Sequence, residues 1–286
     1  MNNPIVEFKN FSYIYPKTEK IVLDGINLSI YEGEFVGIIG CNKAGKSTLC
    51  QSMVGVLPHL LGGKWDGDVL VDGINLGETK GAGATDVIGI VFQDAESQFT
   101  QETVEDEIAF AMCNFGYERS VMRERIISAA TDCGLIDMLD RSPFKLSGGQ
   151  QQRLAVACIL ALQPRVIILD ESTSQLDPIG RDEVFNLVAK LHQQGRTIIM
   201  VDHNVEKIAE YVEKLVVMDK GKIILADKAE DAFQKMEFLE QFNIRVPQVT
   251  EACLKMKECL EIDKAPIKLE NAIQLLQIKL EGTNFE

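Results

Sequence analysis

One stretch near residue 40 has the residue types and spacing of a phosphate-binding loop. The pattern G-x-x-x-x-G-K-[ST] is met by Gly40, Cys41, Asn42, Lys43, Ala44, Gly45, Lys46 and Ser47. In such a loop the backbone N–H groups surround the phosphates, and the N-terminus of the following helix adds partial positive charge. We expect Lys46 to reach the β- and γ-phosphates and the Ser47 hydroxyl to ligate Mg²⁺. The predicted nucleotide-binding set also includes Thr48.

The residues around this loop support the interpretation. Residues 35–39 form a continuous apolar run, which suits a strand buried on both faces in a parallel sheet, and a helix is predicted to begin near Lys46. Lys43 is the unusual member of the loop. If the backbone there needs a positive φ, a lysine costs about 1 kcal/mol relative to glycine. An additional cation near the phosphates would partly offset that cost.

A second apolar strand is predicted to end in two carboxylates. Residues 166–169 are Val, Ile, Ile and Leu, and Asp170 and Glu171 follow. We expect Asp170 to hold Mg²⁺ through its water shell and Glu171 to polarise the attacking water as general base. Acidic pairs are common in turns, so this pattern becomes specific only in combination with the phosphate loop.

The most specific motif is the run Leu-Ser-Gly-Gly-Gln at residues 146–150. It resembles the LSGGQ signature of the ABC ATPases, and residues 151–157 also have the form found in that family. The motif lies just ahead of a predicted helix, whose N-terminus is a second anion-binding end. The resemblance implies that two chains enclose two ATP molecules. In that arrangement the γ-phosphate of the ATP on the other subunit is bound by Ser147, Gly148, Gly149 and Gln150.

Other elements of the same family follow in order. By resemblance, Gln93 is the Q-loop glutamine, a Mg²⁺ and water ligand, and Asp177 belongs to the D-loop, which crosses the dimer interface. His203 resembles the switch histidine that contacts the γ-phosphate and completes the catalytic set with Glu171 and Gln93. Tyr15 matches the aromatic residue that stacks on adenine, with Tyr13 as the alternative.

The resemblance covers residues 4–226 and implies a fold class. That class is an α/β P-loop NTPase with a RecA-like parallel-sheet core, an N-terminal antiparallel β subdomain and a helical subdomain at about 100–150. We expect an ATPase domain at 4–229 and a small C-terminal helical extension at 230–286. The chain departs from the family at Ser172, usually proline, and at Gln175, usually a small residue. Neither departure removes a catalytic group, so we expect an active ATPase.

Hydrophobic periodicity predicts the elements that position these motifs. We expect strands at residues 5–8, 26–30, 35–39, 165–170 and 197–201, a hairpin at 215–219 and 223–226, and two strands within 68–92 around a Gly-rich loop at 77–83. We expect helical segments at about 104–139, 179–193, 229–242 and 249–259. The alternation of strand and helix implies a parallel sheet with helices on both faces.

Residues 94–99 indicate a branch of the family. They resemble a segment of the energy-coupling factor (ECF) importers, which take up vitamins and transition metal ions, where a short helix meets the coupling subunit. We therefore expect Gln98 and Phe99 to form a coupling surface, with the Phe99 ring as its anchor. Residues 105–110 are also similar to that branch. Residues 242–249 and the helical stretch 250–259 resemble its C-terminal extension, which helps to hold two ATPases together. The implied partners are a second ABC ATPase, identical or paralogous, a transmembrane coupling subunit and a membrane substrate-binding subunit.

Two other functions remain open from the sequence. One is a conventional importer ATPase supplied by a binding protein, and the other is a non-transport ABC ATPase acting on DNA or the ribosome. The formal net charge of −14 opposes binding to phosphate backbones, so we expect no nucleic-acid partner. Translation factors of this kind usually carry two cassettes and repair proteins long coiled coils, whereas one cassette and a short helical stretch are predicted here.

Composition bounds the location and the cofactors. No run approaches the 18 apolar residues of a membrane span, and residues 1–4 lack the features of a signal peptide. We therefore expect a peripheral protein on the cytoplasmic face of the cell membrane, with ATP and Mg²⁺ as its ligands. The seven cysteines include no Cys-x-x-Cys pair, which favours reduced thiols over a zinc site.

Overall fold

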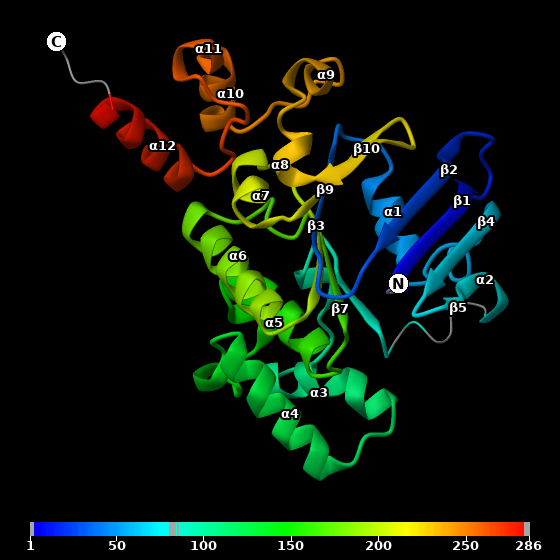
Figure 1. Ribbon diagram of the computed structural model, residues 1–286. Helices are drawn as coiled ribbons and strands as arrows, with labels where there is room; N and C mark the ends of the chain where they lie inside the picture. Colours follow the sequence, from blue (N-terminus) through cyan, green and yellow to red (C-terminus); the bar gives the residue numbers. More distant parts are fainter. Residues whose placement is uncertain (1–2, 80–83, 85, 283–286) are drawn as a thin grey trace.

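Within residues 3–79, 84 and 86–282, which the computed structural model describes, the chain forms two sheets and several groups of helices (Figure 1). The first sheet is antiparallel, in the order β2-β1-β4-β5. Its strands are β1 (Val6–Ile14), β2 (Ile21–Ile30), β4 (Lys64–Val71) and β5 (Ile74–Asn75). The second sheet has six strands in the order β10-β9-β3-β8-β7-β6. They are β3 (Phe35–Gly40), β6 (Ile88–Val91), β7 (Val166–Asp170), β8 (Thr197–Val201), β9 (Lys214–Asp219) and β10 (Lys222–Lys228).

The six-stranded sheet is parallel apart from β10, which pairs with β9 in the antiparallel sense. Every residue of β7 and β8 is buried, as the apolar runs predict for strands covered on both faces. Helix α1 (Lys46–Met53) lies between the two sheets and contacts β4 on one side and β7 on the other. The antiparallel sheet thus packs over α1, and one core cluster joins all three.

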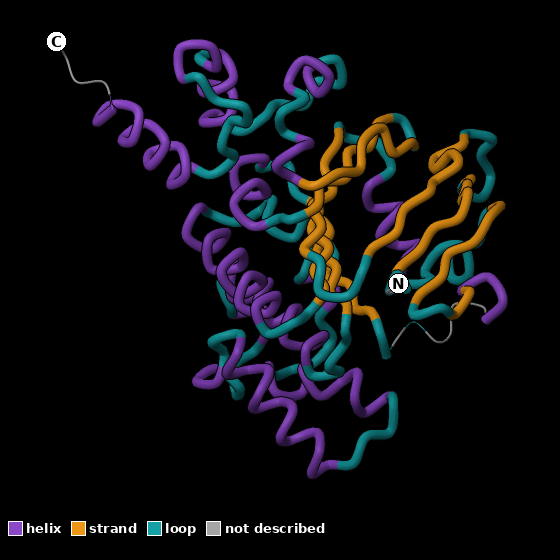
Figure 2. Tube along the Cα trace, viewed as in Figure 1, coloured by secondary structure: helices purple, strands orange, loops and turns teal. Residues whose placement is uncertain are grey.

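The opposite face of the six-stranded sheet is covered by α5 (Gly148–Leu160), α6 (Pro178–Gln193) and α7 (Val205–Tyr211). Figure 2 shows these helices on one side of the strands and the antiparallel sheet on the other. Helices α3 (Val104–Asn114) and α4 (Arg119–Asp132) pack on α5 and project from the core at the lower end of Figure 1. The predicted helical stretch therefore exists, as two helices.

The predicted fold class is confirmed, and several boundaries are corrected. The region 68–92 includes three strands rather than two, because the short β5 pairs with β4 through a tight turn. Strand β4 also begins earlier than predicted, at Lys64. The predicted Gly-rich loop at 77–83 overlaps α2 (Leu76–Thr79), and its remainder, 80–83, lies outside the described residues.

The C-terminal extension differs more from its prediction. The single helix expected at 229–242 is two, α8 (Ala229–Ala232) and α9 (Met236–Glu240), and that at 249–259 is α10 (Gln248–Lys255) and α11 (Lys257–Leu260). Helix α12 (Leu269–Gly282) was not predicted. Leu239, Ile244 and Val246 belong to the main core cluster, so the start of the extension shares the core of the ATPase domain. The proposed domain division at 229/230 stays a prediction.

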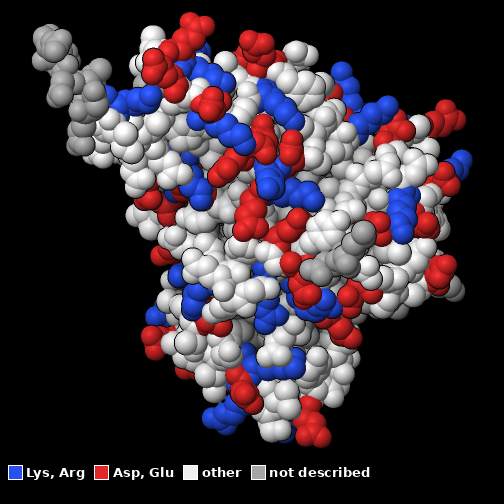
Figure 3. Space-filling model, in the orientation of Figure 1, with Lys and Arg blue, Asp and Glu red and all other residues white. Residues whose placement is uncertain are grey.

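The lengths of the helices and the charges on the surface relate to the predicted membrane and nucleic-acid contacts. None of the helices in the described part of the chain is both long and apolar enough to cross a membrane. On the face drawn in Figure 3, acidic and basic side chains are interspersed over the described residues rather than separated by sign. The absence of a nucleic-acid partner stays a prediction.

Candidate functional site

The phosphate loop joins the buried end of β3 to the N-terminus of α1. Its shape depends on two glycines with positive φ. Gly40 has φ +156, and a Cβ there would lie 2.3 Å from the Met218 carbonyl oxygen, so no side chain fits. Gly45 is the N-cap of α1 with φ +104, in the left-handed region that glycine favours. The loop therefore has the backbone that the motif predicts.

Lys43 also takes a positive φ, +68, so the strain considered from the sequence is present. Its exposed side chain lines the cavity above the loop. A left-handed lysine is about 1 kcal/mol less favourable than glycine.

The predicted phosphate-binding lysine and two of the predicted catalytic residues, Glu171 and His203, meet at one carboxylate oxygen. The Lys46 ammonium, whose side chain is 3% exposed, lies 3.3 Å from Oε1 of Glu171, and His203 Nε2 lies 2.9 Å from the same atom. Lys46 also donates to the carbonyl oxygen of Gly40 at 3.0 Å. Glu171 follows directly after β7 with φ +53, a strained conformation that turns its side chain out of the strand register. The loop, the acidic strand and the switch segment thus form one site.

A pair of oxygen ligands lies beside this group. Ser47 Oγ donates to Asp170 Oδ1 at 3.0 Å. Burial raises the pKa of Asp170 to about 6, although the hydrogen bond from Ser47 opposes that rise. A hydroxyl and a carboxylate at this separation are the hard oxygen donors that Mg²⁺ prefers, so these residues fit the ion. Gln93 instead donates to Ser174 Oγ at 3.3 Å, and its role as a Mg²⁺ ligand stays a prediction.

A cavity of about 600 Å³ opens over the loop and is strongly basic. Its lining includes Lys43 and Lys46 with two lysines that the sequence did not single out, Lys20 and Lys220, against one carboxylate, Glu171. Lys220 reaches the site because the β9–β10 turn is bonded to the loop: the N–H of Gly221 donates to the Ala44 carbonyl at 2.9 Å. No local motif could have indicated this contact, because it joins segments far apart in the chain.

The two aromatic candidates for adenine stacking differ in exposure. Tyr13 is fully buried, and its hydroxyl donates to the Gly62 carbonyl, so it belongs to the core. Tyr15 is half-buried, and its hydroxyl lies 3.2 Å from that of Thr48, which lines the cavity. The geometry favours Tyr15, whose stacking on adenine stays a prediction.

The signature residues form the N-terminus of α5 and lie apart from this cavity. Ser147 caps the helix and exchanges a reciprocal pair of hydrogen bonds with Gln150. Gly149 lies against Gly180, because a Cβ on Gly149 would be 3.3 Å from the Gly180 Cα. Asp177 caps α6 by accepting from the Gly180 N–H at 2.7 Å. The signature and the D-loop are therefore adjacent, and the described lining of the loop cavity includes neither.

The structure contradicts one part of the predicted coupling surface. The segment does form a short helix, η1 (Glu96–Gln98), and Gln98 is half-buried. The Phe99 ring, however, is 7% exposed and belongs to the main core cluster, so it cannot project as an anchor. Glu107, which the sequence did not single out, fixes the residues that follow, because its carboxylate accepts the N–H groups of Thr100 and Gln101, both at 2.8 Å.

The sequence of this chain is similar to those of known ATP-binding proteins. A family model described as ABC transporter matches residues 23–174. A putative ABC transporter ATP-binding protein of Pyrococcus horikoshii is 39% identical over 274 residues, 96% of each chain. The energy-coupling factor transporter ATP-binding protein EcfA2 of Acetivibrio thermocellus is 40% identical over 258 residues, 88% of this chain and 90% of that protein.

Two solved structures resemble the fold over most of the chain. One is cbiO1 from Clostridium perfringens, described as part of the ABC transporter complex cbiONQ, with a TM-score of 0.73 and 30% identity over 91% of this chain and 100% of that one. The other is the dimeric ATP-binding cassette MJ0796 in a post-hydrolysis state bound to ADP and Pi, with a TM-score of 0.68 and 29% identity over 78% and 98%. These similarities agree with the resemblance that the signature motif carried.

Proposed function

This chain belongs to the ABC transporter family of ATP-binding proteins, and on that premise we propose that it is the ATPase of an ECF-type importer, working as one half of a dimer. The observation that carries the proposal is the meeting of Lys46, Glu171 and His203 on one carboxylate oxygen beneath a basic cavity. The substrate is ATP.

Each group has a distinct part in hydrolysis. Lys46 and the loop N–H groups bind the phosphates, and Glu171 accepts a proton from the attacking water. His203 holds the Glu171 carboxylate in place through the 2.9 Å contact. Ser47 and Asp170 would hold Mg²⁺, which when bound neutralises charge on the β- and γ-phosphates.

The described lining of the loop cavity includes none of the signature residues, and we infer that the signature of a second chain supplies donors to the outer side of the γ-phosphate. The N-terminus of α5 is a preorganised anion-binding end, since Ser147 and Gly148 are exposed and the helix begins there. Because Asp177 lies beside it, both would face the same partner. The dimeric state of MJ0796, which is bound to ADP and Pi, supports this pairing.

Mixing two inactive variants tests the shared site. Lys46→Ala disables the phosphate loop, and Ser147→Arg places a bulky side chain at the signature. Each variant alone should lack ATPase activity. A mixture forms heterodimers in which one loop and one signature, contributed by different chains, are both intact, so activity should return.

The matched control mixes Lys46→Ala with Glu171→Gln. Both residues belong to the same chain's loop site, so no heterodimer contains an intact site and activity should stay absent. Equal activity in the two mixtures, or none in either when the parent is active, contradicts a site shared between two copies of this chain.

The partners beyond the dimer follow from the named relatives. EcfA2 is named as an energy-coupling factor transporter subunit and cbiO1 as part of a transporter complex, which supports membrane partners and a position on the cytoplasmic face of the membrane. We propose that a coupling subunit contacts η1, with Gln98 rather than Phe99 contributing the accessible side chain.

Uptake by the reconstituted complex tests that surface. Gln98→Ala should lower substrate uptake while the ATPase rate and the fold are retained. The same change at Gln194, exposed at the end of α6, is the control and should leave uptake unchanged. Normal uptake and co-purification with Gln98→Ala would remove the support that η1 gives to the ECF branch.

A further inference from the structure

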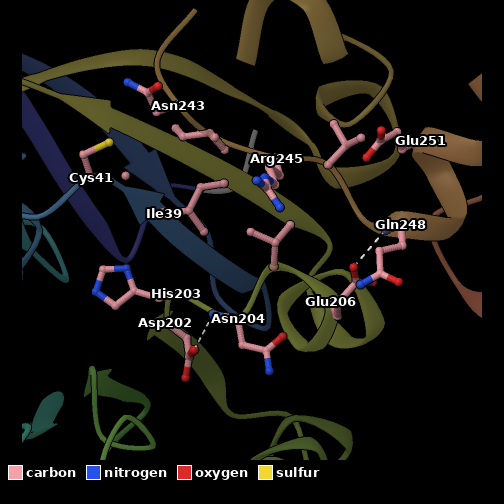
Figure 4. Close-up of a pocket in the computed structure, with 14 residues that line it drawn as sticks. Ile39, Cys41, Asp202, His203, Asn204, Glu206, Asn243, Arg245, Gln248 and Glu251 are labelled. Carbon is pink, nitrogen blue, oxygen red and sulfur yellow. Dashed lines mark hydrogen bonds between the residues drawn. The ribbon is translucent and has the colours of Figure 1, made fainter. Parts of the chain in front are cut away.

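Residues 242–248, here called the strap, lead from α9 into α10 beside the nucleotide site. A cavity of about 410 Å³ is lined by the strap, by residues 39–41 at the junction of β3 and the phosphate loop, and by residues 202–206 of the switch segment (Figure 4). Ile244 and Val246 are 6% and 4% exposed and pack into the main core, while Asn243 and Arg245 are exposed. The strap is therefore anchored by alternate side chains.

Two hydrogen bonds tie the strap to the phosphate loop on one side and to the switch segment on the other. The Cys41 thiol donates to the Phe242 carbonyl oxygen at 3.3 Å. At the other end, the Gln248 N–H donates to Glu206 Oε1 at 2.8 Å, as the dashed line in Figure 4 shows. Cys41 follows Gly40, whose carbonyl accepts from Lys46, and Glu206 lies three residues after His203 in the first turn of α7.

The bond to Glu206 has a clear physical basis. Gln248 is the first residue of α10, and the N–H groups of a first helical turn have no partner within the helix. The N-cap residue, Pro247, makes no side-chain capping bond. Glu206 supplies that cap from another helix, and its negative charge also favours the positive end of α10. The bond joins α7 and α10 at a position where α10 needs an acceptor.

We propose that the strap is a positioning element of the ATPase, which fixes the distance between the phosphate loop and the switch segment. Lys46 and His203 approach the same oxygen of Glu171 from these two sides. Relative movement of the sides would stretch one of the strap's bonds and misplace the groups that act on the attacking water. The inference rests on the proposed ATPase function. Misplaced catalytic groups lower the rate of the chemical step more than they weaken ATP binding.

Gln248→Pro isolates the tether. Proline lacks the N–H that Glu206 accepts, it is favoured at the first position of a helix, and the preceding residue already has the extended conformation that proline requires (φ −53, ψ 142). The matched control is Gln248→Ala, which keeps the N–H. In the full-length ATPase, Gln248→Pro should reduce kcat about three- to tenfold relative to Gln248→Ala, as expected for one hydrogen bond. The Kd for ATP should differ by less than about twofold between the two variants.

Changes at the acceptor give an independent measurement. Glu206→Ala removes the acceptor and should match Gln248→Pro, whereas Glu206→Gln keeps a carbonyl oxygen and should restore most of the parental kcat. Because both changes remove the same bond, the double variant Glu206→Ala, Gln248→Pro should lose no more than either single variant. The Glu206 pair decides the question if Gln248→Pro fails to fold.

The outcomes separate three cases. Equal kcat in Gln248→Pro and Gln248→Ala, or additive losses in the double variant, overturns the positioning role. A lower melting temperature with unchanged kcat shows that the tether only stabilises the extension, which also overturns it. A parental chain that binds but does not hydrolyse ATP contradicts the proposed function itself, before the strap variants are compared.

Discussion

The nucleotide site and the C-terminal extension differ in how well their side chains are buried and held by contacts. The site rests on the ends of β3 and β7, whose residues are almost all buried, and its side chains are held by contacts of 2.9–3.3 Å. The extension consists largely of short helices, and α12 exposes Leu269, Ile273 and Leu276, which are 64%, 46% and 38% exposed. The side chains of the site are held in place by contacts within one chain. The outer extension instead exposes an apolar surface that a partner could cover.

The largest effect should come from the centre of the ordered region. Glu171→Gln removes the general base but keeps the side-chain shape, so steady-state hydrolysis should fall by about 10²-fold or more while ATP still binds. An ATP-bound dimer should accumulate and be visible by gel filtration. Glu237→Gln, an exposed glutamate of α9, is the control. Turnover close to that of the parent would remove Glu171 from the mechanism.

Lys46→Ala tests binding within the same site. The ammonium is almost fully buried, and its removal takes away a charged donor to the phosphates. ATP affinity should fall about 10- to 100-fold, the range for a hydrogen bond to a charged group. Direct titration with ATP measures it. If affinity is retained and only turnover falls, Lys46 acts in the transition state alone.

The comparison explains what the sequence could predict. The loop, the acidic strand and the signature are each a run of neighbouring residues, so the sequence alone identifies them. The structure brings Lys46, Glu171 and His203 into contact, and their roles at the γ-phosphate stay predictions. Contacts between segments far apart in the chain could not be predicted from a local motif. Lys220 lines the site because the β9–β10 turn is hydrogen-bonded to Ala44. The burial of Phe99 in the core could not be predicted, because a six-residue segment is too short for periodicity to distinguish buried from exposed positions.

The extension was predicted least well for a related reason. Its helices are short, so few turns were available to establish a period, and Ile244 and Val246 pack into a core formed by other parts of the chain. Helix α12 has an apolar side that faces solvent here, which weakens the contrast of inside and outside on which such predictions depend.

A change on α12 tests whether the extension contributes to self-association. Ile273→Ser removes an apolar side chain from the stripe formed with Leu269 and Leu276, and burial of such a side chain in an interface is worth about 1.5–3 kcal/mol. The dimer dissociation constant should rise about 10- to 100-fold, as measured by sedimentation without nucleotide. Ile278→Ser, 68% exposed on the other side of the same helix, is the control and should have no effect. Equal effects at the two positions would exclude the stripe as the contact.

The smallest effect is expected at Lys43, where the ordered site departs from its motif. The side chain is exposed and the backbone has φ +68, so strain and charge act in opposite directions. Lys43→Gly removes both, and Lys43→Ala removes the charge but keeps a side chain in the left-handed region. Both variants should stay active, because Lys46 is the buried cation that contacts Glu171. ATP affinity should fall only about two- to threefold, as for an exposed charge, and the difference should shrink as salt is raised.

Stability separates the strain from the charge. Lys43→Gly should raise the free energy of unfolding by up to about 1 kcal/mol relative to Lys43→Ala, because glycine adopts a positive φ without steric conflict, although its freer unfolded chain offsets part of that gain. Denaturant titration of both variants without nucleotide measures it. If Lys43→Gly instead loses activity as fully as Lys46→Ala, the exposed Lys43 supplies a charge that hydrolysis requires, as the buried Lys46 does.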